Sequence, residues 1–407
     1  MKTFAYTKDS LARFLSHEDR LKYGVATGAQ EQRILSGIQA RINSGGQLFS
    51  FKKFTKNSRE MCKPCDIETE VLVRKVNHDF LKLTKARVSN RADTISALKS
   101  VCSEGQAMTI IRLDIKKFFQ NVSTSKVLNC ASRGINNTYA LRRNIERYLS
   151  WAETHIRGVP IGVSLSSSLT EYYLREYLDN NASALPGVHF YRRYVDDIIM
   201  VCSADGDPEK YIEEAEKLLP KELKFNTRSD KRDIVKLHYE KDEGDFNYLG
   251  YRFKVGRKGS SGSSNSRSIT LDVAPSKIAK RKNRFVYTLL QFLKDGSEPD
   301  LRRRFLLLNS GYTFWDSNRG REMSAGLCNN YSEIDHPSEA LKELRNFYRS
   351  SMLNPKFQLY HRLRYSHLST STRRMIISFD LQKHVEERKH FNFSPEELQH
   401  LTSCWKK

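Results

Sequence analysis

The spacing of apolar and polar residues divides the first part of the chain into helical and strand-like stretches. Residues 1–45 carry apolar positions three and four residues apart, which predicts a helical layer. DIETEVLVRKVNHDFLKL, at 66–83, predicts a long amphipathic helix that Asp66 can cap. MTIIRLDI, at 108–115, has the β-branched density of a buried strand. Helices therefore precede the first strand of the predicted sheet.

Strands are predicted to alternate with helices through the middle of the chain. VHFYRRYVDDIIMVCS, at 188–203, has two apolar and aromatic runs around a polar centre, which predicts a hairpin with Val195, Asp196 and Asp197 at its turn. A helical pattern covers 209–219. Further strands are predicted around LKFN, IVKLHYE and FNYLGYRFKV, at 223–226, 234–240 and 246–255. This order favours an α+β fold with helices packed on one face of a sheet.

A change of composition marks the last third of the chain. GRKGSSGSSNSRS, at 256–268, is rich in glycine and serine, and we interpret it as a flexible loop or linker. ITLDVA then leads into a basic helix, KIAKRKNRFVYTLLQFL, and into a helical region that continues to Lys407. Lys277, Lys280, Arg281 and Lys282 crowd this helix, and Arg302–Arg304 follow it. A solvated helix face and a nucleic-acid surface both explain such a run.

The charge balance indicates a polyanionic partner. Of the 407 residues, 69 are lysine or arginine and 47 are aspartate or glutamate, so the net charge is +22. Nucleic acid is the leading partner, ahead of an anionic membrane, because no lysine-rich helix has an aromatic face. We expect a cytoplasmic protein, since the first residues lack an apolar segment and no run of eighteen apolar residues occurs. Seven scattered cysteines agree with a reducing compartment, and the Cys62 and Cys65 pair lacks the second pair that a zinc finger requires.

Three aspartates form the strongest chemical signal. Asp114 is predicted at the carboxyl end of a strand, and Asp196 with Asp197 at a hairpin turn. A turn that favours aspartate explains the pair, but it does not explain the apolar runs on both sides. Adjacent carboxylates in such a setting repel each other unless a cation neutralises them. Mg²⁺ takes oxygen ligands, so the three side chains are candidates for a site with two Mg²⁺ ions, with Mn²⁺ as an alternative.

Four motifs in order resemble the palm motifs of reverse transcriptases. RLDIKKFF, GVPIGVSLSSSLTEYYL, RRYVDDIIMV and FNYLGYRF carry the resemblance, which extends from roughly Phe49 to Phe285. It implies a right-hand polymerase with fingers, a palm and a helical, basic, thumb-like C-terminal region. The implied divisions are an N-terminal extension at 1–48, fingers at 49–107, a palm at 108–255, the linker at 256–268 and a thumb-like region at 269–407.

The resemblance also assigns the residues that meet the nucleotide. It implies that Asp114, Asp196 and Asp197 are the catalytic metal ligands. Phe119 resembles the aromatic gate against the 2′-hydroxyl group of a nucleotide, with core packing as the expected role of Phe118. The resemblance implies that one of Lys53, Lys56 and Arg59 holds the triphosphate. It implies that Lys231 protonates the pyrophosphate.

Template and primer contacts follow from the same resemblance. GVPIG resembles the segment under the templating base pair and contributes Gly158, Pro160 and Gly162, although the family usually has glutamine at the position of Ile161. YLGY resembles the primer grip, with Tyr248 and Gly250. The basic helix with Lys277, Lys280, Arg281 and Lys282 lies where polymerases place a thumb that tracks the duplex.

Within the family, the chain most resembles bacterial unknown-group, or defence-associated and abortive-infection-like, reverse transcriptases. RxDIKxFF, RYVDD, FxYLGY and the following KIxK helix carry this likeness. It implies cDNA synthesis from dNTPs on a structured non-coding RNA in anti-phage defence. Two alternatives remain: untemplated or protein-primed DNA synthesis, for which the 19 tyrosines offer hydroxyl groups, and a non-catalytic RNA-binding scaffold.

Overall fold

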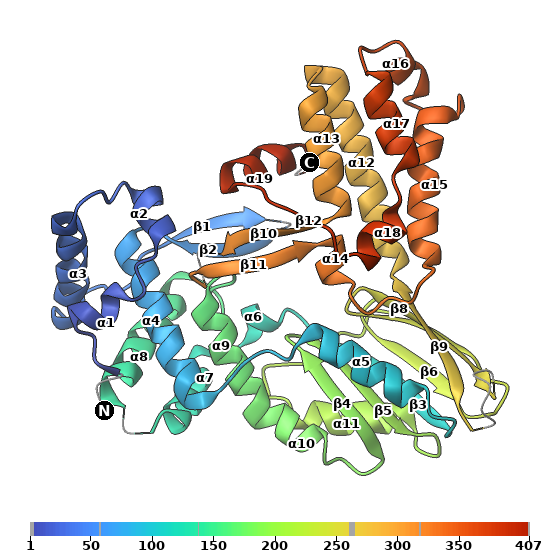
Figure 1. The fold of residues 1–407 in the computed structure, drawn as a ribbon. Coiled ribbons are helices and arrows are strands. Elements are labelled where there is room, and N and C mark those ends of the chain that lie inside the picture. Colours follow the sequence, from blue (N-terminus) through green and yellow to red (C-terminus); the bar gives the residue numbers. More distant parts are fainter. Residues whose placement is uncertain (1–3, 57, 137, 260–264, 317–318, 406–407) are drawn as a thin grey trace. The chain divides into compact units, whose positions relative to one another are not determined.

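Four strands form the sheet that carries the aspartates, in the order β4-β5-β3-β6 (Figure 1). The central strand β3 (Met108–Asp114) is buried along nearly its whole length, as its run of β-branched and apolar residues predicts. β4 (Val188–Tyr194) and β5 (Asp197–Ser203) form the predicted hairpin. β6 (Asp233–Leu237) lies at the other edge.

The chain folds into two units. The computed structural model describes residues 4–56, 58–136, 138–259, 265–316 and 319–405. Unit 1 comprises Met1–Asn90, Met108–Lys236 and Asp316–Arg321. Unit 2 comprises Arg91–Ala107, Leu237–Trp315 and Glu322–Lys407.

Helices make up most of the rest of unit 1. Asp66 caps the long helix as predicted, because its carboxylate accepts a hydrogen bond from the backbone N–H of Thr69 at 2.7 Å. A hairpin of β1 (Phe51–Lys56) and β2 (Arg59–Pro64) precedes that helix. The helices are α1 (Lys8–Ala12), α2 (His17–Tyr23), α3 (Gly28–Asn43), α4 (Ile67–Thr84), α6 (Phe118–Asn121), α7 (Thr124–Gly134), α8 (Tyr139–His155), α9 (Ser164–Leu174), the π-helical turn η2 (Arg175–Asp179), α10 (Asn180–Ala182) and α11 (Pro208–Leu218).

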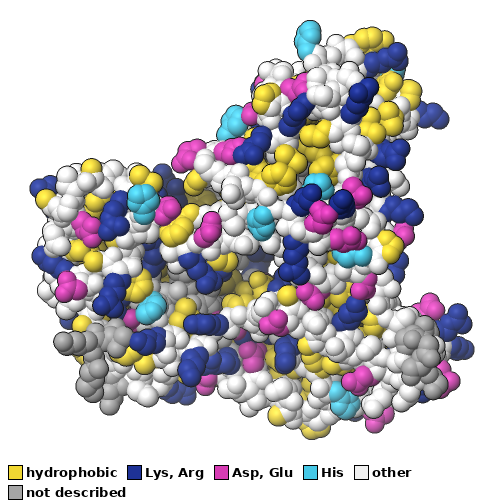
Figure 2. Space-filling view, viewed as in Figure 1, with side chains coloured by type: hydrophobic (Ala, Val, Ile, Leu, Met, Phe, Trp, Pro, Cys, Tyr) yellow, Lys and Arg dark blue, Asp and Glu magenta, His cyan; other side chains and the backbone are white. Residues whose placement is uncertain are grey.

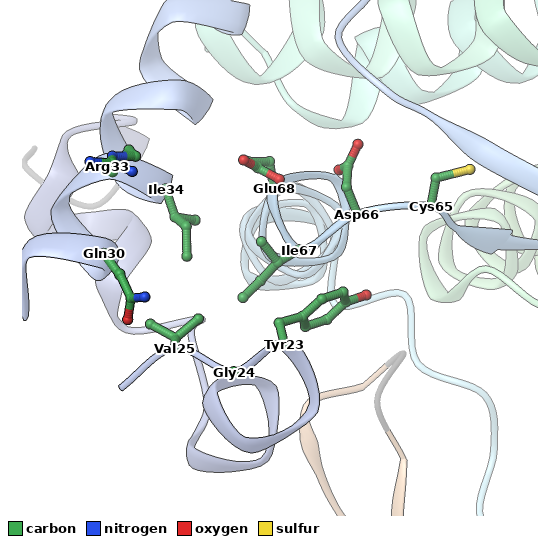
Figure 3. A pocket seen from close by; sticks show the side chains of 10 residues that line it. All are labelled: Tyr23, Gly24, Val25, Gln30, Arg33, Ile34, Cys65, Asp66, Ile67 and Glu68. Carbon is green, nitrogen blue, oxygen red and sulfur yellow. The ribbon is translucent and has the colours of Figure 1, made fainter. Parts of the chain in front are cut away.

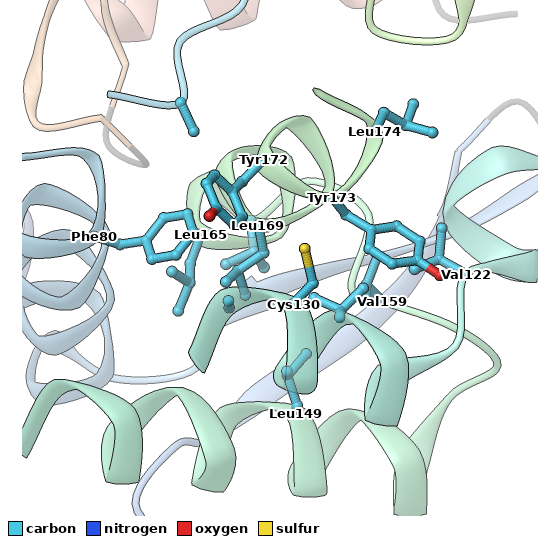
Figure 4. Close-up of a cluster of buried hydrophobic side chains, with 14 of the residues drawn as sticks. Phe80, Val122, Cys130, Leu149, Val159, Leu165, Leu169, Tyr172, Tyr173 and Leu174 are labelled. Atoms are coloured by element: carbon cyan, nitrogen blue, oxygen red, sulfur yellow. The ribbon is translucent and has the colours of Figure 1, made fainter. Parts of the chain in front are cut away.

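Helix α9 is the centre of the unit 1 core (Figure 4). Leu165 and Leu169 are fully buried one turn apart, and the ring of Tyr172 meets that of Phe80 on α4 edge-on, at a centroid distance of 5.7 Å. A helix that is buried on nearly every side is a core helix rather than a surface one. Each large apolar side chain buried there contributes roughly 1.5–3 kcal/mol, so α9 is a rigid support for the residues that bind to it.

Unit 2 combines a three-stranded sheet, β7-β8-β9, with a group of helices and a second small sheet, β11-β10-β12 (Figure 1). The first sheet is antiparallel throughout. The elements are α5 (Arg91–Cys102), β7 (Gly244–Tyr248), β8 (Tyr251–Lys258), β9 (Arg267–Val273), α12 (Pro275–Asp295), α13 (Glu298–Asn309), β10 (Gly311–Asp316), β11 (Arg321–Gly326), α14 (Leu327–Asn330), α15 (Glu339–Leu353), α16 (Tyr360–Arg364), α17 (Thr370–Ser378), α18 (Leu381–Glu386), β12 (His390–Phe391), α19 (Pro395–Thr402) and the 3₁₀ turn η3 (Ser403–Trp405).

The structure differs from the sequence-based expectations at four places. The strand expected at 246–255 is divided between β7 and β8 by a turn at Leu249 and Gly250. The strand expected at 223–226 is a single bridge between Ile115 and Phe225. The glycine- and serine-rich stretch is not a linker between domains: its first three residues end β8 and its last two begin β9, so it closes a hairpin, and residues 260–264 lie outside the described part. The expected boundaries at 107 and 255 also do not separate the units, because 91–107 and 237–255 both belong to unit 2.

Candidate active site

The three aspartates meet at one end of β3 and β5 in unit 1. Asp114 is the last residue of β3 and lies directly opposite Asp197, the first residue of β5. Val195 and Asp196 form the two-residue loop between β4 and β5, since Tyr194 pairs with Asp197. The carbonyl of Asp196 accepts a hydrogen bond from the N–H of Ile115 at 3.1 Å. Two stretches about 80 residues apart in sequence are thereby joined, as the sequence predicts.

The turn that holds the aspartate pair is strained. Val195 has φ of +59°, a left-handed conformation that a β-branched residue rarely adopts. Such a residue costs on the order of 1–3 kcal/mol and persists only where the surroundings enforce it. Here the Nη1 group of Arg193 donates to the carbonyl of Val195 at 2.8 Å. Strain held by a specific contact is typical of functional sites.

Arg193 anchors this turn to the core helix, a role that the sequence reasoning missed. Its side chain is 4% exposed, and both terminal nitrogens donate to the carboxylate of Glu171 on α9 at 2.8 Å. Nε and Nη2 donate to Asp179 at 2.8 and 2.6 Å, and Asp179 ends the π-helical turn that comes after α9. The local signal was weak: Glu171 follows a serine-rich start of the helix, and Glu176 and Asp179 come after it.

The electrostatics of the aspartates differ from those of ordinary surface carboxylates. Burial, followed by the charges of Asp197 and Asp114, raises the pKa of Asp196 to about 6. Burial also raises the pKa of Asp197, although the charge of Arg112 opposes this. Arg112 approaches Asp197 at 3.7 Å, and the ammonium group of Lys231 lies 2.8 Å from Asp114. Arg112 and Lys231 thus neutralise part of the negative charge of the three aspartates.

The donor set fits a divalent cation, although the side chains are not yet arranged around one. Within the described residues, no three His, Cys, Asp or Glu side chains are grouped so that they could hold a metal ion as they stand. Asp114 and Asp197 face Lys231 and Arg112 instead. Carboxylate oxygens are the ligands that Mg²⁺ prefers, and burial together with the charges of Asp197 and Asp114 raises the pKa of Asp196. Asp114, Asp196 and Asp197 are therefore the residues able to hold the ions.

The two phenylalanines after β3 have different surroundings, as expected. Phe118 is 3% exposed and belongs to the core, whereas Phe119 is only partly buried against it. Their ring centroids lie 5.0 Å apart. Phe119 is thus the one with a ring face available to a ligand.

The GVPIG segment links the Phe119 turn to the β1–β2 hairpin. The N–H of Val159 donates to the carbonyl of Phe119 at 2.9 Å, and a Cβ on Gly158 would meet that same oxygen at 2.1 Å. On the other side, the carbonyl of Ile161 accepts from the N–H of Cys62 on β2 at 2.8 Å. Gly158 is therefore required by close backbone approach, in addition to its positive φ of +79°.

The three basic candidates of the β1–β2 hairpin are not equivalent. Lys53 lines a cleft of about 630 Å³ together with Gln120 and Ile161, and its ammonium group donates to the carbonyl of His155 at 3.0 Å. Lys56 and Arg59 are exposed and pair with each other where the hairpin closes. Lys53 is thus the candidate beside the GVPIG segment, next to the position where the family usually has glutamine.

A second cavity in unit 1 lies apart from these residues (Figure 3). It has a volume of about 410 Å³ and is lined by residues of 23–34 and 65–68, including Tyr23, Ile34 and Glu68. None of the candidate site residues lines it. Cys65 is at its rim and Cys62 is buried, and both thiols are free.

In unit 2, the YLGY segment is a tight hairpin turn. Leu249 and Gly250 both have positive φ, +48° and +81°, which is the requirement of a type I′ turn. A Cβ on Gly250 would lie 3.0 Å from Cε of Lys277 and 3.2 Å from the hydroxyl of Tyr331. Tyr248 is fully buried, so its ring is a core group, and any contact of this turn with a primer would come from the backbone or from its neighbours.

The prediction that four basic residues of helix α12 contact the duplex also needs correction. Lys277 and Lys280 are exposed, but Lys282 is bound to Glu343 at 2.5 Å. The guanidinium of Arg281 donates to the carbonyl of Leu308, and burial lowers its pKa. Two of the four predicted duplex contacts are thus tied into the fold.

The arginine run on α13 serves the fold in the same way. Arg302 contacts Glu298, Ser371 and Thr372. Arg303 pairs with Glu397, and the buried Arg304 pairs with Asp300.

Comparison with known proteins supports the sequence interpretation. Residues 53–253 match the family model described as reverse transcriptase (RNA-dependent DNA polymerase). The matched range includes the three aspartates, Phe119, the GVPIG segment and the YLGY turn. The comparison with curated proteins gave no match. No helix in the part of the chain that the structure describes is long and apolar enough to cross a membrane. The family match identifies this protein as an RNA-directed DNA polymerase, a nucleotidyltransferase.

Proposed function

We propose that Asp114, Asp196 and Asp197 form the catalytic centre of this polymerase and bind two Mg²⁺ ions. The observation that supports this most directly is the pairing of Asp114 opposite Asp197, with Asp196 in the adjoining two-residue turn. Bound Mg²⁺ would lower the pKa of the primer 3′-hydroxyl group and neutralise charge on the departing pyrophosphate. The raised pKa of Asp196 supports the same assignment, because a bound dication stabilises its ionised form.

The other candidate residues have separate proposed tasks. Lys53 neutralises the triphosphate, with Lys56 and Arg59 as the weaker candidates. Lys231 carries a proton to pyrophosphate once it leaves its ion pair with Asp114. Lys277 and Lys280 contact the phosphates of the template and primer strands, and the turn at Gly250 supports the primer.

The function is tested by DNA synthesis on RNA. Purified protein should incorporate dNTPs on a primed RNA template in the presence of Mg²⁺ or Mn²⁺ and lose this activity in excess EDTA. The same assay without a template, with DNA covalently attached to protein as the readout, tests protein-primed synthesis. Template-independent product that carries a tyrosine linkage would favour that alternative, and RNA binding without any synthesis would favour the scaffold.

Phe119 is expected to set the choice of sugar. Replacing Phe119 by valine should raise the relative use of rNTPs about ten- to a hundredfold, because the smaller side chain leaves room for the 2′-hydroxyl group. The measurement is the ratio of kcat/KM for dNTP and rNTP. Phe118→Val is the matched control: it removes a core ring, costs on the order of 2–3 kcal/mol of stability and should leave the ratio unchanged. Unchanged sugar selection in Phe119→Val would remove the gate assignment.

A biological role in anti-phage defence, with a cognate structured non-coding RNA as template, is also proposed. It is supported by the likeness of RLDIKKFF, RRYVDD and the KIAK helix to defence-associated reverse transcriptases. A cytoplasmic location agrees with the seven free cysteines. Sequencing the RNA that copurifies with the protein tests this role: one dominant structured RNA supports it, and a random sample of cellular RNA contradicts it.

A further inference from the structure

One stretch of unit 2 carries no acidic residue. Residues 344–379 contain seven lysines and arginines and two histidines but no aspartate or glutamate. At the overall frequency of 47 acidic residues in 407, a stretch of 36 would contain about four. The arginine run on α13, in contrast, is accompanied by acidic partners. The positive charge of residues 344–379 is therefore not neutralised by acidic residues within the same stretch.

The stretch folds into the end of one helix group. It covers most of α15, all of α16 and all of α17, and α15 packs against both of the others (Figure 1). Leu359 and Leu363 face inward and are buried, while Arg362 and Arg364 on either side of Leu363 are exposed. The short helix α16 thus presents its basic residues to solvent, because Leu363 and the preceding Leu359 are buried on its other side.

Five cations define this surface, which we call the basic tip: Arg349, Lys356, Arg362, Arg364 and Arg374. All five are exposed, and in the described part of the chain none of them forms an ion pair. Glu298, an acidic group with contacts into this region, accepts hydrogen bonds from Ser369 and Thr372 and pairs with Arg302. Figure 2 shows lysine and arginine side chains beside hydrophobic ones over this end of the helix group.

An aromatic ring lies among these cations. Tyr365 directly follows Arg364 and is 80% exposed, the most exposed of the large hydrophobic side chains in the described residues. His361 and His367 are exposed nearby. Exposed rings between cations are the features that bind single-stranded nucleic acid, since phosphates meet the cations and unstacked bases stack on the rings. A membrane would require a continuous apolar face, and Leu359 and Leu363 are buried.

We propose that the basic tip binds single-stranded segments of RNA that lie outside the polymerase site. The tip shares no residue with the proposed catalytic or primer-binding groups. Its function would be to hold an unpaired loop or tail of the template RNA through phosphates and at least one stacked base. The inference needs only RNA as a ligand and does not depend on the assigned roles of the aspartates.

The test uses the full chain with Asp196→Asn, so that no synthesis occurs during binding. The probe is an RNA hairpin with a 12-nucleotide single-stranded tail, compared with the same hairpin without the tail. Arg362→Ala with Arg364→Ala should weaken binding of the tailed RNA roughly tenfold near 0.15 M salt and reduce the slope of log K against log salt by about 1.4. Tyr365→Ala should weaken it by about the same factor, and Tyr365→Phe should restore it.

The matched control removes two exposed charges from an acidic helix. Lys210→Ala with Lys217→Ala on α11 should leave the affinity for tailed RNA unchanged. Circular dichroism and the melting temperature verify that the tip variants fold. Extension of a short primer on a tail-free template, measured with Asp196 intact, should also be unaffected by the tip substitutions, which separates this inference from the catalytic assignment.

Three results would overturn the inference. The first is equal affinity and equal salt slope for the double arginine variant and the parent protein. The second is an equal loss of affinity for the tailed and tail-free hairpins. The third is unchanged RNA binding together with lost binding to vesicles of anionic phospholipid, which would assign the tip to a membrane surface instead.

Discussion

Replacing Asp196 and Asp197 by asparagine is expected to reduce primer extension at least about a thousandfold while RNA affinity stays within roughly threefold. The loss is expected because the amide groups cannot supply the negative charge that binds the metal ions, and such ions stabilise the transition state by several kcal/mol. Binding is retained because the basic surface, not the carboxylates, attracts the phosphates. Single-turnover extension and equilibrium RNA binding measure the two effects.

A control separates charge from general damage to the site. Asp205→Asn with Asp207→Asn removes two exposed carboxylates from the segment after β5 and should leave extension unchanged. If the Asp196 and Asp197 double variant still extends a primer, the catalytic centre is elsewhere. If RNA binding is lost along with synthesis, the aspartates support the fold rather than the reaction.

The raised pKa of Asp196 also predicts that replacing this residue by asparagine stabilises the metal-free protein. Burial and like charge raise its pKa from 3.8 to about 6, so the folded state binds the proton more tightly than the unfolded state. This destabilisation is absent below about pH 4 and fully present above about pH 6. Asp196→Asn should therefore stabilise the protein in EDTA by roughly 1–2 kcal/mol at pH 7 and by little at pH 4. Urea unfolding at the two pH values measures it; equal effects would contradict the assigned pKa.

Arg193→Met is expected to cost about 3–5 kcal/mol of stability, the largest effect on stability that we predict. Removing the guanidinium leaves the buried carboxylate of Glu171 and the half-buried carboxylate of Asp179 without their shared cation. It also releases the carbonyl of Val195, so the strained turn loses its support. Urea unfolding gives the cost, and kcat at a temperature where the variant is folded gives the effect on the aspartates.

The neighbouring residue supplies the control for Arg193. Arg192 is exposed, and Arg192→Met should change stability by less than about 0.5 kcal/mol. A second variant tests the cause: adding Glu171→Gln to Arg193→Met should restore part of the lost stability, because one unpaired charge is removed. Equal stability of the Arg192 and Arg193 variants would show that the network does not support the turn.

The sequence allowed prediction of the elements whose pattern is local. The buried strand ending at Asp114 and the hairpin around Asp196 are predicted by short runs of apolar residues, and both form in the structure. The expectation that one of Phe118 and Phe119 packs in the core and the other is more exposed also agrees with the structure. The roles of these residues in catalysis stay predictions.

The features that the sequence did not predict depend on partners that are distant in the sequence. Arg193 looked like any basic residue of a strand until burial joined it to Glu171, which lies 22 positions earlier. The charge of Lys282 appeared available for a duplex, yet Glu343, which neutralises it, is 61 positions away. Composition likewise could not show that β8 and β9 pair on both sides of the glycine- and serine-rich stretch. Ion pairing and strand pairing are properties of the fold, not of a local pattern.

The two-residue loop between β4 and β5 restricts how this enzyme can vary. Surface loops usually accept inserted residues at little thermodynamic cost. An extra residue here would shift β5 by one position against β3, and a shift of one residue turns every side chain of a strand to the opposite face. Asp197 would then lie where Ile198 now lies, opposite Leu113 and no longer opposite Asp114. The length of this loop is therefore as closely constrained as its chemistry, and relatives should differ here by substitution and not by insertion or deletion.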